Sequence, residues 1–588
     1  MKFLFVLYRF GRDITGGAEI HHRRLIDDLL LLGHKVEVWT TTGKEIPPVG
    51  HWGVDWQSGY PEGTEVEKET GLVIRRFGMD RVPRLILALT AKHVEHKLDE
   101  LKYHPELLAK LHAVEYTTER KAPFLDLWTG WHHPENSPEG PARWSGSTAR
   151  FMLGHDGEAE TLVLEGSTPE PKQLHLQLAP GLLLKKTVSG MFKWEVPLKE
   201  LAPGIHEVTL STSGTKPLRD HRVLGFYLKS AELLNKKGVP VCNANIGEDV
   251  RSIGRRHFHE WIPLLEERAS RISQQTCGWF DWLRGPRSSA LKNALRNVPE
   301  DVDLVVACNF PWSVIPLVAE QCKRPWAAMA LWHLEDDYYH WPHYTAALRK
   351  AAFVLANTPF SEREFFTPRG ITARFVGPGI PPLKKPASSP SPKTGTLYST
   401  KETKPGFRML TVSRKSGEKR YQLIVEAVEL LREQQPQLNA TLTFIGPDGD
   451  GAPLPPWVDY RGRVDDEALA EAYAESDVFL LLSDSESFGM VVAEAWLHGK
   501  PVIVNRHCGP VASLVDEGEN GFAVGTVEEC CARLKELAAD ADLRQRLGAA
   551  GKLKTEREYL QRAATLRFLK AAEEFTPATI SVPQSPTR

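Results

Sequence analysis

The sequence predicts an α/β fold with an all-β segment inserted in its N-terminal half. Two short apolar runs, Phe3–Tyr8 and Val478–Leu482, have the length and composition of buried strands, and a glycine and a helical pattern follow each of them. A third strand-like run, Met409–Val412, precedes a polar loop and another helical pattern. The interval from about 121 to 228 instead contains short alternating runs between Gly and Pro turns, which are typical of antiparallel strands.

Length and composition set the limits of the interpretation. A chain of 588 residues predicts about four structural units, and 41% hydrophobic residues suffice for several cores. The 73 basic and 75 acidic side chains nearly balance, which argues against a nucleic-acid partner. The seven cysteines are odd in number and lack metal-site spacing, so we expect a reducing compartment rather than a disulfide framework.

The sequence also bears on location. No run of about eighteen apolar residues could cross a bilayer, and the N-terminus lacks a signal-peptide pattern, so we expect a cytoplasmic protein. Candidates for peripheral contact with the inner face of the membrane are Arg251, Arg255, Arg256 and the basic helix 552–570. A run of cations is, however, usually a solvated face.

Two glutamates flank a glycine that opens a predicted helix. The strand Val478–Leu482 ends shortly before Glu486, and Gly489 begins the helix that contains Glu494. The amides at the start of such a helix suit a diphosphate. Glu494 could accept hydrogen bonds from ribose hydroxyls, and Glu486 from sugar or acceptor hydroxyls. Taken alone, two glutamates at this spacing are more simply a solvated helix face.

Two cations on the loop after Met409–Val412 strengthen the interpretation. Arg414 and Lys419 could reach the phosphates of the same ligand and stabilise a leaving nucleoside diphosphate.

With these residues in this order, the chain resembles the large retaining glycosyltransferase family of GT-B fold that is usually numbered family four. Arg414 and Lys419 match its phosphate-binding pair, and Glu486 and Glu494 match its two-glutamate signature. Gly446 and the run 461–464 match loops beside the nucleotide base. The resemblance implies two Rossmann-like domains facing a cleft, and transfer of a sugar with retention of configuration.

The resemblance further implies the ligands and partners. The donor would be a UDP-, GDP- or ADP-sugar, with no cofactor and no metal, and the acceptor a glycan or a lipid-linked acceptor, by default in assembly of a bacterial surface polysaccharide. The predicted catalytic residues are Glu486, His333, Arg414 and Lys419. The predicted donor-binding residues are Gly16, Gly17, Arg414, Lys419, Arg463, Val464, Glu486, Phe488, Gly489, Met490 and Glu494.

Some of these residues have a plainer interpretation. A histidine at a strand end, such as His333, is more often structural, although the order of the flanking segments favours the donor-sugar contact that the family has. Gly16-Gly17 alone is an ordinary turn before a helix. Asp448-Gly-Asp450 has the form of a metal-binding motif, but its Gly and Pro-rich surroundings favour a turn.

The chain departs from the family pattern at two places. Arg420 occupies a position where the family commonly has Gly, and the loop 508–513 replaces one that commonly reads Gly-Gly followed by Glu. These changes put local contacts and donor preference in doubt, but not the reaction class.

We expect seven segments. They are an N-terminal Rossmann-like domain in two parts, 1–118 and 233–383, an inserted β-sandwich at 119–232, a linker at 384–404, a C-terminal domain at 405–555, a helix at 556–575 and a disordered tail at 576–588.

The inserted segment carries clustered aromatic residues near its start. Trp128, Trp131 and Trp144 could form a sugar-binding platform together with neighbouring polar side chains, or they could fill the ends of the sandwich core, which is the simpler interpretation. His132-His133 is not predicted to bind metal. The insertion could contact a glycan, a protein partner or nothing.

Rival functions follow from the same architecture. A nucleotide-sugar epimerase or a sugar phosphorylase can share two Rossmann-like domains, but the Arg, Lys, Glu, Glu set argues against both. A third alternative is a weak or inactive transferase that serves as a glycan-binding protein.

Overall fold

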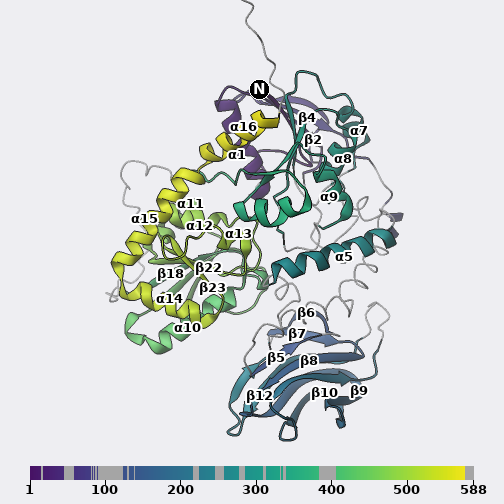
Figure 1. The fold of residues 1–588 in the computed structure, drawn as a ribbon, viewed down its shortest axis with the longest axis vertical. Helices are drawn as coiled ribbons and strands as arrows, with labels where there is room; N and C mark the ends of the chain where they lie inside the picture. The colour runs from purple at the N-terminus through teal and green to yellow at the C-terminus, as the bar shows by residue number, and fades with distance from the viewer. Residues whose placement is uncertain are drawn as a thin grey trace, which may run out of the picture. The chain divides into compact units, whose positions relative to one another are not determined.

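The computed structural model forms two compact units, the larger built on Met1–Val94, Thr276–Gly449 and Pro455–Arg588, and the smaller mainly on Glu95–Gln275 (Figure 1). The structure describes residues 1–14, 17–44, 59–80, 83, 85–86, 89–90, 123–128, 131–137, 140–215, 224–244, 257–276, 285, 287–308, 313–331, 333–334, 340–382 and 406–575. Gly16, the predicted linker, the predicted tail and the arginines at 251, 255 and 256 lie outside the described residues.

The N-terminal domain contains one eight-stranded sheet in the order β17-β16-β15-β14-β1-β2-β4-β3. Every pairing in it is parallel except the one between β3 and β4. Its strands are β1 (Lys2–Val6), β2 (Lys35–Thr41), β3 (Gly63–Val66), β4 (Val73–Phe77), β14 (Leu304–Cys308), β15 (Trp326–Met329), β16 (Phe353–Ala356) and β17 (Ala373–Phe375). Its helices are α1 (Gly17–Leu31), α7 (Ser289–Leu295), α8 (Val314–Gln321), α9 (Pro342–Leu348), a π-helix η2 (Ser361–Phe366) and a short 3-10 turn η3 (Thr367–Arg369).

The C-terminal domain contains a six-stranded sheet, all parallel, in the order β20-β19-β18-β21-β22-β23. Its strands are β18 (Arg408–Val412), β19 (Thr441–Ile445), β20 (Val458–Gly462), β21 (Val478–Leu481), β22 (Val502–Asn505) and β23 (Gly521–Val524). Its helices are α10 (Tyr421–Gln434), α11 (Asp466–Glu475), α12 (Met490–Leu497), α13 (Gly509–Ala512), α14 (Val527–Ala539) and α15 (Ala541–Glu558), with 3-10 turns η4 (Gly417–Lys419) and η5 (Pro436–Leu438). Two Rossmann-like domains are therefore confirmed.

The last helix of the chain returns to the N-terminal domain. Helix α16 (Gln561–Phe575) lies beside α1, where the yellow end of the chain meets its purple beginning in Figure 1. Phe568 is fully buried, and its ring lies 5.3 Å from that of Phe3 on β1. Ile380 exchanges backbone hydrogen bonds with residues 559 and 561. The two crossings of the chain between the domains thus run side by side.

The inserted segment is all-antiparallel β structure, but its form differs from the predicted sandwich of two separate sheets. Nine strands make one continuous sheet in the order β5-β8-β11-β9-β12-β7-β6, with β10 paired to β9 and β13 paired to β12. They are β5 (Phe124–Leu127), β6 (Trp131–Ser137), β7 (Gly140–Ser145), β8 (Thr148–His155), β9 (Ala159–Ala179), β10 (Leu182–Pro197), β11 (Gly204–Ser211), β12 (Tyr227–Asn235) and β13 (Pro240–Asn243). The buried side chains of these strands form one hydrophobic cluster. The same unit includes α5 (Phe258–Thr276).

Strand β9 explains why the prediction divided the sheet. The sequence predicts short runs separated by Gly and Pro turns, whereas β9 runs through Pro169 and Pro171. Its pairing with β12 ends at Ser167, its pairing with β11 begins at His175, and its register with β10 shifts between Thr168 and Lys172, so no partner needs the amides that proline lacks. The sheet also continues to Asn243, beyond the predicted boundary at 232.

Two of the predicted tryptophans of the insertion differ in burial. Trp131 is 4% exposed, contacts Phe151 and Phe226 edge-on, and donates its Nε1–H to the Arg150 carbonyl, so it belongs to the core as the simpler interpretation held. Trp144 is half-buried and pairs across strands with Tyr227, with ring centroids 5.0 Å apart.

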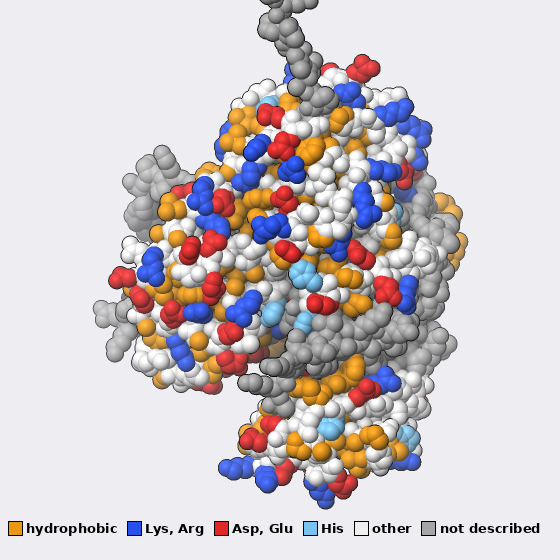
Figure 2. All heavy atoms as spheres, viewed as in Figure 1, with side chains coloured by type: hydrophobic (Ala, Val, Ile, Leu, Met, Phe, Trp, Pro, Cys, Tyr) orange, Lys and Arg blue, Asp and Glu red, His pale blue; other side chains and the backbone are white. Residues whose placement is uncertain are grey.

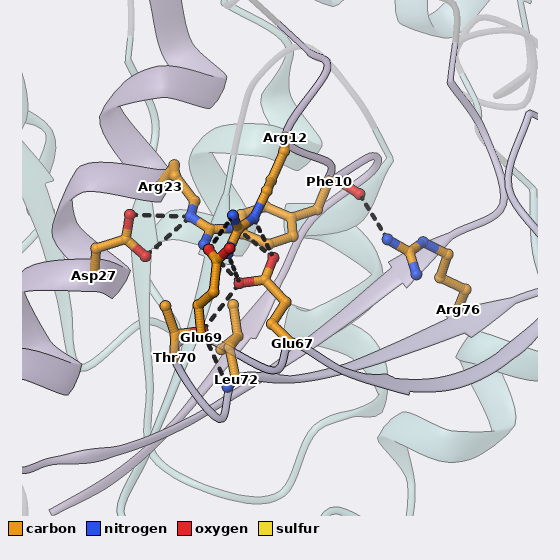
Figure 3. A network of polar contacts seen from close by, with 9 residues as sticks. All are labelled: Phe10, Arg12, Arg23, Asp27, Glu67, Glu69, Thr70, Leu72 and Arg76. Atoms are coloured by element: carbon orange, nitrogen blue, oxygen red, sulfur yellow. Dashed lines mark hydrogen bonds and ion pairs between the residues drawn. The ribbon is translucent and has the colours of Figure 1, made fainter.

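A polar network fixes the loop after β1 in the N-terminal domain (Figure 3). Arg23 of α1 holds Glu67 by two hydrogen bonds of 2.6 Å, and Arg12 of the loop donates to the same carboxylate at 3.2 Å. Burial alone would raise the pKa of Glu67, but the hydrogen bonds from Arg23 and Arg12 lower it to about 2. This doubly paired carboxylate therefore ties the loop to α1 and to the β3–β4 hairpin.

Two adjacent histidines on α1 predict an acid-sensitive N-terminal domain. Burial lowers the pKa of His21 from 6.5 to about 4 and that of His22 well below 6.5. The folded state therefore binds fewer protons than the unfolded state between pH 6.5 and 4, and stability falls as the pH falls through that window. For His21 alone the loss reaches about 3 kcal/mol. We expect the unfolding midpoint of His21→Gln to depend less on pH; an unchanged slope would contradict this assignment.

Charges of both signs are interspersed over the face of the molecule shown in Figure 2. In the part of the chain that the structure describes, no helix combines the length and apolarity that a membrane crossing needs.

Candidate functional site

The strand order of the C-terminal sheet selects one edge as the place for a ligand. Strand β18 lies at its centre, the chain proceeds outward through β19 and β20, and then crosses back to continue from β21 on the other side of β18. At such a switch in direction, the loops after the two central strands diverge and leave a crevice at the carboxyl ends of the strands. The loops that follow β18 and β21 contain Arg414, Lys419 and Glu486. The predicted site therefore lies where the topology favours one.

Lys419 and Glu486 meet across this switch point. The Lys419 ammonium donates to Glu486 Oε1 at 2.7 Å and to the Ser485 carbonyl at 3.3 Å, and both side chains of the ion pair are 16% exposed. The pair is therefore reachable from solvent although partly desolvated. A diphosphate could replace the carboxylate at Lys419 and leave Glu486 to accept hydrogen bonds from sugar hydroxyls.

His333 reaches the same loop from the N-terminal domain. It follows β15, and its Nδ1 lies 3.0 Å from Ser485 Oγ. His340 Nε2 hydrogen-bonds to the Leu334 carbonyl at 2.8 Å. The structure thus brings three of the four predicted catalytic residues, His333, Lys419 and Glu486, to one loop.

The loop after β18 depends on a glycine and on a second lysine. Gly446, at the end of β19, has φ +142°, and a Cβ there would lie 1.8 Å from the Ser413 carbonyl oxygen. Lys415 is buried and pairs with Asp448 at 2.9 Å. The Asp448-Gly-Asp450 motif therefore uses its first aspartate in an internal ion pair, as expected for a structural turn. Arg414 is exposed on this loop, and its Cδ would lie 3.0 Å from a Cβ at Gly449.

Glu494 lies on α12 and is held from one side. Tyr473 of α11, 1% exposed, donates its hydroxyl to Glu494 Oε2 at 3.2 Å. Burial raises the pKa of Glu494, and the charge of Asp466 raises it further. The hydrogen bond from Tyr473 and the charge of Arg24 on α1 lower it. Burial lowers the pKa of Arg24, which the charge of Glu494 partly restores. A cation of the N-terminal domain therefore acts on the charge of Glu494.

The residues just before α12 contribute to the predicted site through their backbone rather than through their side chains. Gly489 precedes the helix with φ +88°, and a Cβ there would lie 3.0 Å from Val511 Cγ2. Phe488 is 1% exposed and packs edge-on against Tyr559. The Phe488 side chain is therefore part of the core, and the predicted contact with the donor is left to the Phe488 backbone. Met490 and Val464 pack against the same core, whereas Arg463 is exposed.

The loop between β1 and α1 contains a cluster that the sequence did not single out. Glu19 is 6% exposed, and its Oε1 accepts hydrogen bonds from Tyr8 and from Arg9 Nε and Nη2, the latter two at 2.9 and 2.7 Å. Arg9 also donates to the Lys44 carbonyl, beyond the end of β2. Gly17 begins α1 two residues before Glu19. The cluster therefore fixes the start of α1; the signal that could have found it is the polar Tyr8-Arg9 directly after an apolar strand.

Comparison with known proteins agrees with the C-terminal geometry. Residues 399–554 match the family described as glycosyl transferases group 1. The matched stretch is the C-terminal Rossmann-like domain, and it includes all of Arg414, Lys419, Glu486 and Glu494.

Individual relatives share parts of the chain. Sulfoquinovosyl transferase SQD2 of Arabidopsis thaliana is 33% identical over 161 residues, which are 25% of this chain and 30% of that protein. A D-inositol 3-phosphate glycosyltransferase of Paenarthrobacter aurescens is 26% identical over 229 residues, 37% of this chain and 56% of its own. The chain thus spans between about a third and about half of the length of these curated relatives. The crystal structure of the pneumococcal O-GlcNAc transferase GtfA with UDP and GlcNAc covers 98% of this chain and 99% of its own at 13% identity, with a TM-score of 0.44.

Proposed function

We propose that the protein is a glycosyltransferase that takes its sugar from a nucleoside-diphosphate sugar. The observation that carries the proposal is the Lys419–Glu486 pair, which joins the two loops at the switch point of the C-terminal sheet. A cation and an acceptor group at that edge suit a diphosphate and an adjoining sugar, respectively. The match of the C-terminal domain to glycosyl transferases group 1, and relatives named as glycosyl or sulfoquinovosyl transferases, support the same reaction class.

Each residue has a role in the proposed reaction. Lys419 and Arg414 stabilise the negative charge that develops on the leaving diphosphate, and the backbone at Gly489 and Met490 contributes helix-start amides. Glu494 accepts hydrogen bonds from the ribose, and Glu486 and His333 orient the donor sugar. With the positive charge of two side chains and the helix start on the diphosphate, the mechanism that we propose uses no metal ion.

The proposed step is a substitution on one face of the sugar. The bond between the anomeric carbon and the diphosphate oxygen breaks, and a bond to the acceptor oxygen forms on the same face. The acceptor's proton passes to the departing phosphate, and the configuration is retained. His333 comes from the N-terminal domain and Glu486 from the C-terminal domain, so we propose that the reaction takes place in a cleft between two GT-B domains and needs their closure.

We propose further that the acceptor is a glycan or a lipid-linked acceptor. The work of the enzyme would be assembly of a bacterial surface polysaccharide, carried out in the cytoplasm or at the inner face of the membrane.

A donor panel tests the reaction class. Purified protein is incubated with UDP-, GDP- and ADP-sugars in EDTA, and release of nucleoside diphosphate is followed with wild type and with Glu494→Ala. We expect wild type alone to release nucleoside diphosphate from one donor. Failure with every donor would contradict the proposal and favour a glycan-binding protein on the same scaffold; activity only after metal is added would contradict metal independence.

The pH dependence of nucleotide binding tests the role of Glu494. Ribose hydroxyls donate to a carboxylate better than to a carboxyl group, so affinity for the nucleoside diphosphate should fall on acidification. Because burial raises the Glu494 pKa, the midpoint should lie above 4.5. In Tyr473→Phe, which loses a bond that lowers this pKa, the midpoint should move upward; Glu494→Gln should lose the step. Calorimetric titration at several pH values measures both, and a step that persists in Glu494→Gln would assign it to another group.

The raised pKa of Glu494 also affects the stability of the fold, where acidification has the opposite effect to the one on nucleotide binding. A raised pKa means that the folded state without nucleotide binds more protons than the unfolded state from pH 4.5 upward to the raised value. Glu494 therefore lowers stability as the pH rises through that window.

A further inference from the structure

A second ion pair crosses the switch point beside the first. Arg420 follows Lys419 directly, and its Nη1 lies 3.2 Å from Asp484 Oδ2, two residues before Glu486. Asn505, at the end of β22, donates its Nδ2–H to Asp484 Oδ1 at 3.0 Å. The loops after β18 and β21 are therefore joined by two ion pairs, Lys419–Glu486 and Arg420–Asp484.

The two pairs differ in the burial of their carboxylates. Each side chain of the Lys419–Glu486 pair is 16% exposed; in the second pair Arg420 is 18% exposed, whereas the Asp484 side chain is 4% exposed and both of its oxygens have partners. A ligand can compete for Lys419, but it meets the Asp484 carboxylate already surrounded. Glu486, the more accessible carboxylate, is thus suited to exchange its cation for a ligand, whereas the buried Asp484 carboxylate is suited to keep its partners.

The backbone at Arg420 indicates that its side chain is needed. Arg420 has φ +49°, in the left-handed region, and it precedes α10 without making a side-chain cap bond to the helix. Glycine would adopt this conformation without strain. The strain of this backbone conformation is therefore offset by a contact of the arginine side chain. The contact that crosses the site is the hydrogen bond to Asp484.

We propose that Arg420 and Asp484 are positioning residues that hold the Glu486 loop in register when Lys419 leaves Glu486 for the diphosphate. Without the Arg420–Asp484 pair, the substrate that recruits Lys419 would also release the loop that must hold the sugar. With it, the loop keeps its place: residues 483–485 are buried, and Ser485 remains beside His333. The effect of this pair on turnover rests on the proposed function, whereas its role in holding the loop does not.

Amide hydrogen exchange of the full-length protein tests the mechanical part. Because residues 483–485 are buried, exchange in a peptide covering 482–489 reports opening of this loop. We expect Arg420→Gly, which relieves the strain but removes the pair, to speed exchange there by roughly tenfold, and Asp484→Asn to do the same. Lys419→Ala, which removes the contacts of Lys419 with Glu486 and the Ser485 carbonyl but keeps the Arg420–Asp484 pair, should stay within about threefold of wild type. Equal exchange in Arg420→Gly and wild type, or equally fast exchange in Lys419→Ala and Arg420→Gly, would overturn the proposal.

Kinetics test the catalytic part with a donor that wild type uses. Loss of register should lower kcat in Arg420→Gly and Asp484→Asn by roughly tenfold, while the Kd of the nucleoside diphosphate changes by less than about threefold. Arg420→Lys, which keeps a cation, should recover most of kcat. An equal loss of kcat in Arg420→Lys, or a loss confined to Kd, would contradict positioning. If wild type uses no donor, the proposed function fails, and the exchange measurement still decides the role of the pair.

Discussion

Replacing Lys419 by alanine is expected to lower kcat by on the order of 10²–10³, because it removes a cation aimed at the charge that develops on the leaving diphosphate. Both side chains of the Lys419–Glu486 pair are 16% exposed, so water can reach the Glu486 carboxylate that the replacement leaves without its lysine. The free energy of unfolding should therefore change by less than about 1 kcal/mol. Turnover of the donor and a thermal unfolding scan measure the two effects separately.

The control is another lysine of the same domain. Lys552 on α15 is exposed, and its replacement by alanine changes the net charge of the chain equally. We expect Lys552→Ala to turn over like wild type. Equal activity of Lys419→Ala and Lys552→Ala would remove Lys419 from the mechanism and leave its pair with Glu486 as a structural contact.

Replacing Gly446 by alanine is expected to destabilise the C-terminal domain by roughly 3 kcal/mol or more. The new Cβ would lie 1.8 Å from the Ser413 carbonyl oxygen, and φ +142° is a conformation that side-chain-bearing residues rarely adopt. Because the clash is with backbone, the loop that begins at Ser413 must move. Chemical denaturation followed by fluorescence measures the loss, and nucleotide affinity should fall with it because Arg414 is on the displaced loop.

Gly417→Ala is the matched control for this effect. Gly417 lies in the loop after β18 that the Gly446 clash would displace, its φ is not in the left-handed region, and a Cβ there meets nothing within 4 Å. Its free energy of unfolding should remain within about 1 kcal/mol of wild type. A loss as small in Gly446→Ala would show that the loop after β18 adapts easily and does not depend on this glycine.

The sequence could predict the core of the site because its chemistry lies in short segments. Arg414 and Lys419 directly follow one buried strand and Glu486 follows another, so parallel pairing brings them to the same edge whatever the rest of the chain does. The Lys419–Glu486 contact is the outcome. The same holds for His333, which follows β15 and contacts Ser485.

Other features depend on contacts between segments that local patterns do not connect. Tyr473 looks like a core residue of α11, and only the structure joins its hydroxyl to Glu494. Arg420 is noticed in the sequence as a departure from glycine, but its reason is a carboxylate 64 positions away. In the insertion, Pro169 and Pro171 resemble turn residues, although β9 continues through them where its neighbours do not pair.

The most direct test of the account is whether Glu494 contacts the ribose of a nucleotide bound at the switch point. Calorimetric titration in EDTA compares UDP, GDP and ADP with their 2′,3′-dideoxy forms on wild type and on Glu494→Ala. The account predicts that wild type binds one of the three and prefers the ribose form by roughly tenfold or more, and that Glu494→Ala loses the preference. Nucleotide binding with the same ribose preference in both proteins would contradict the proposed site.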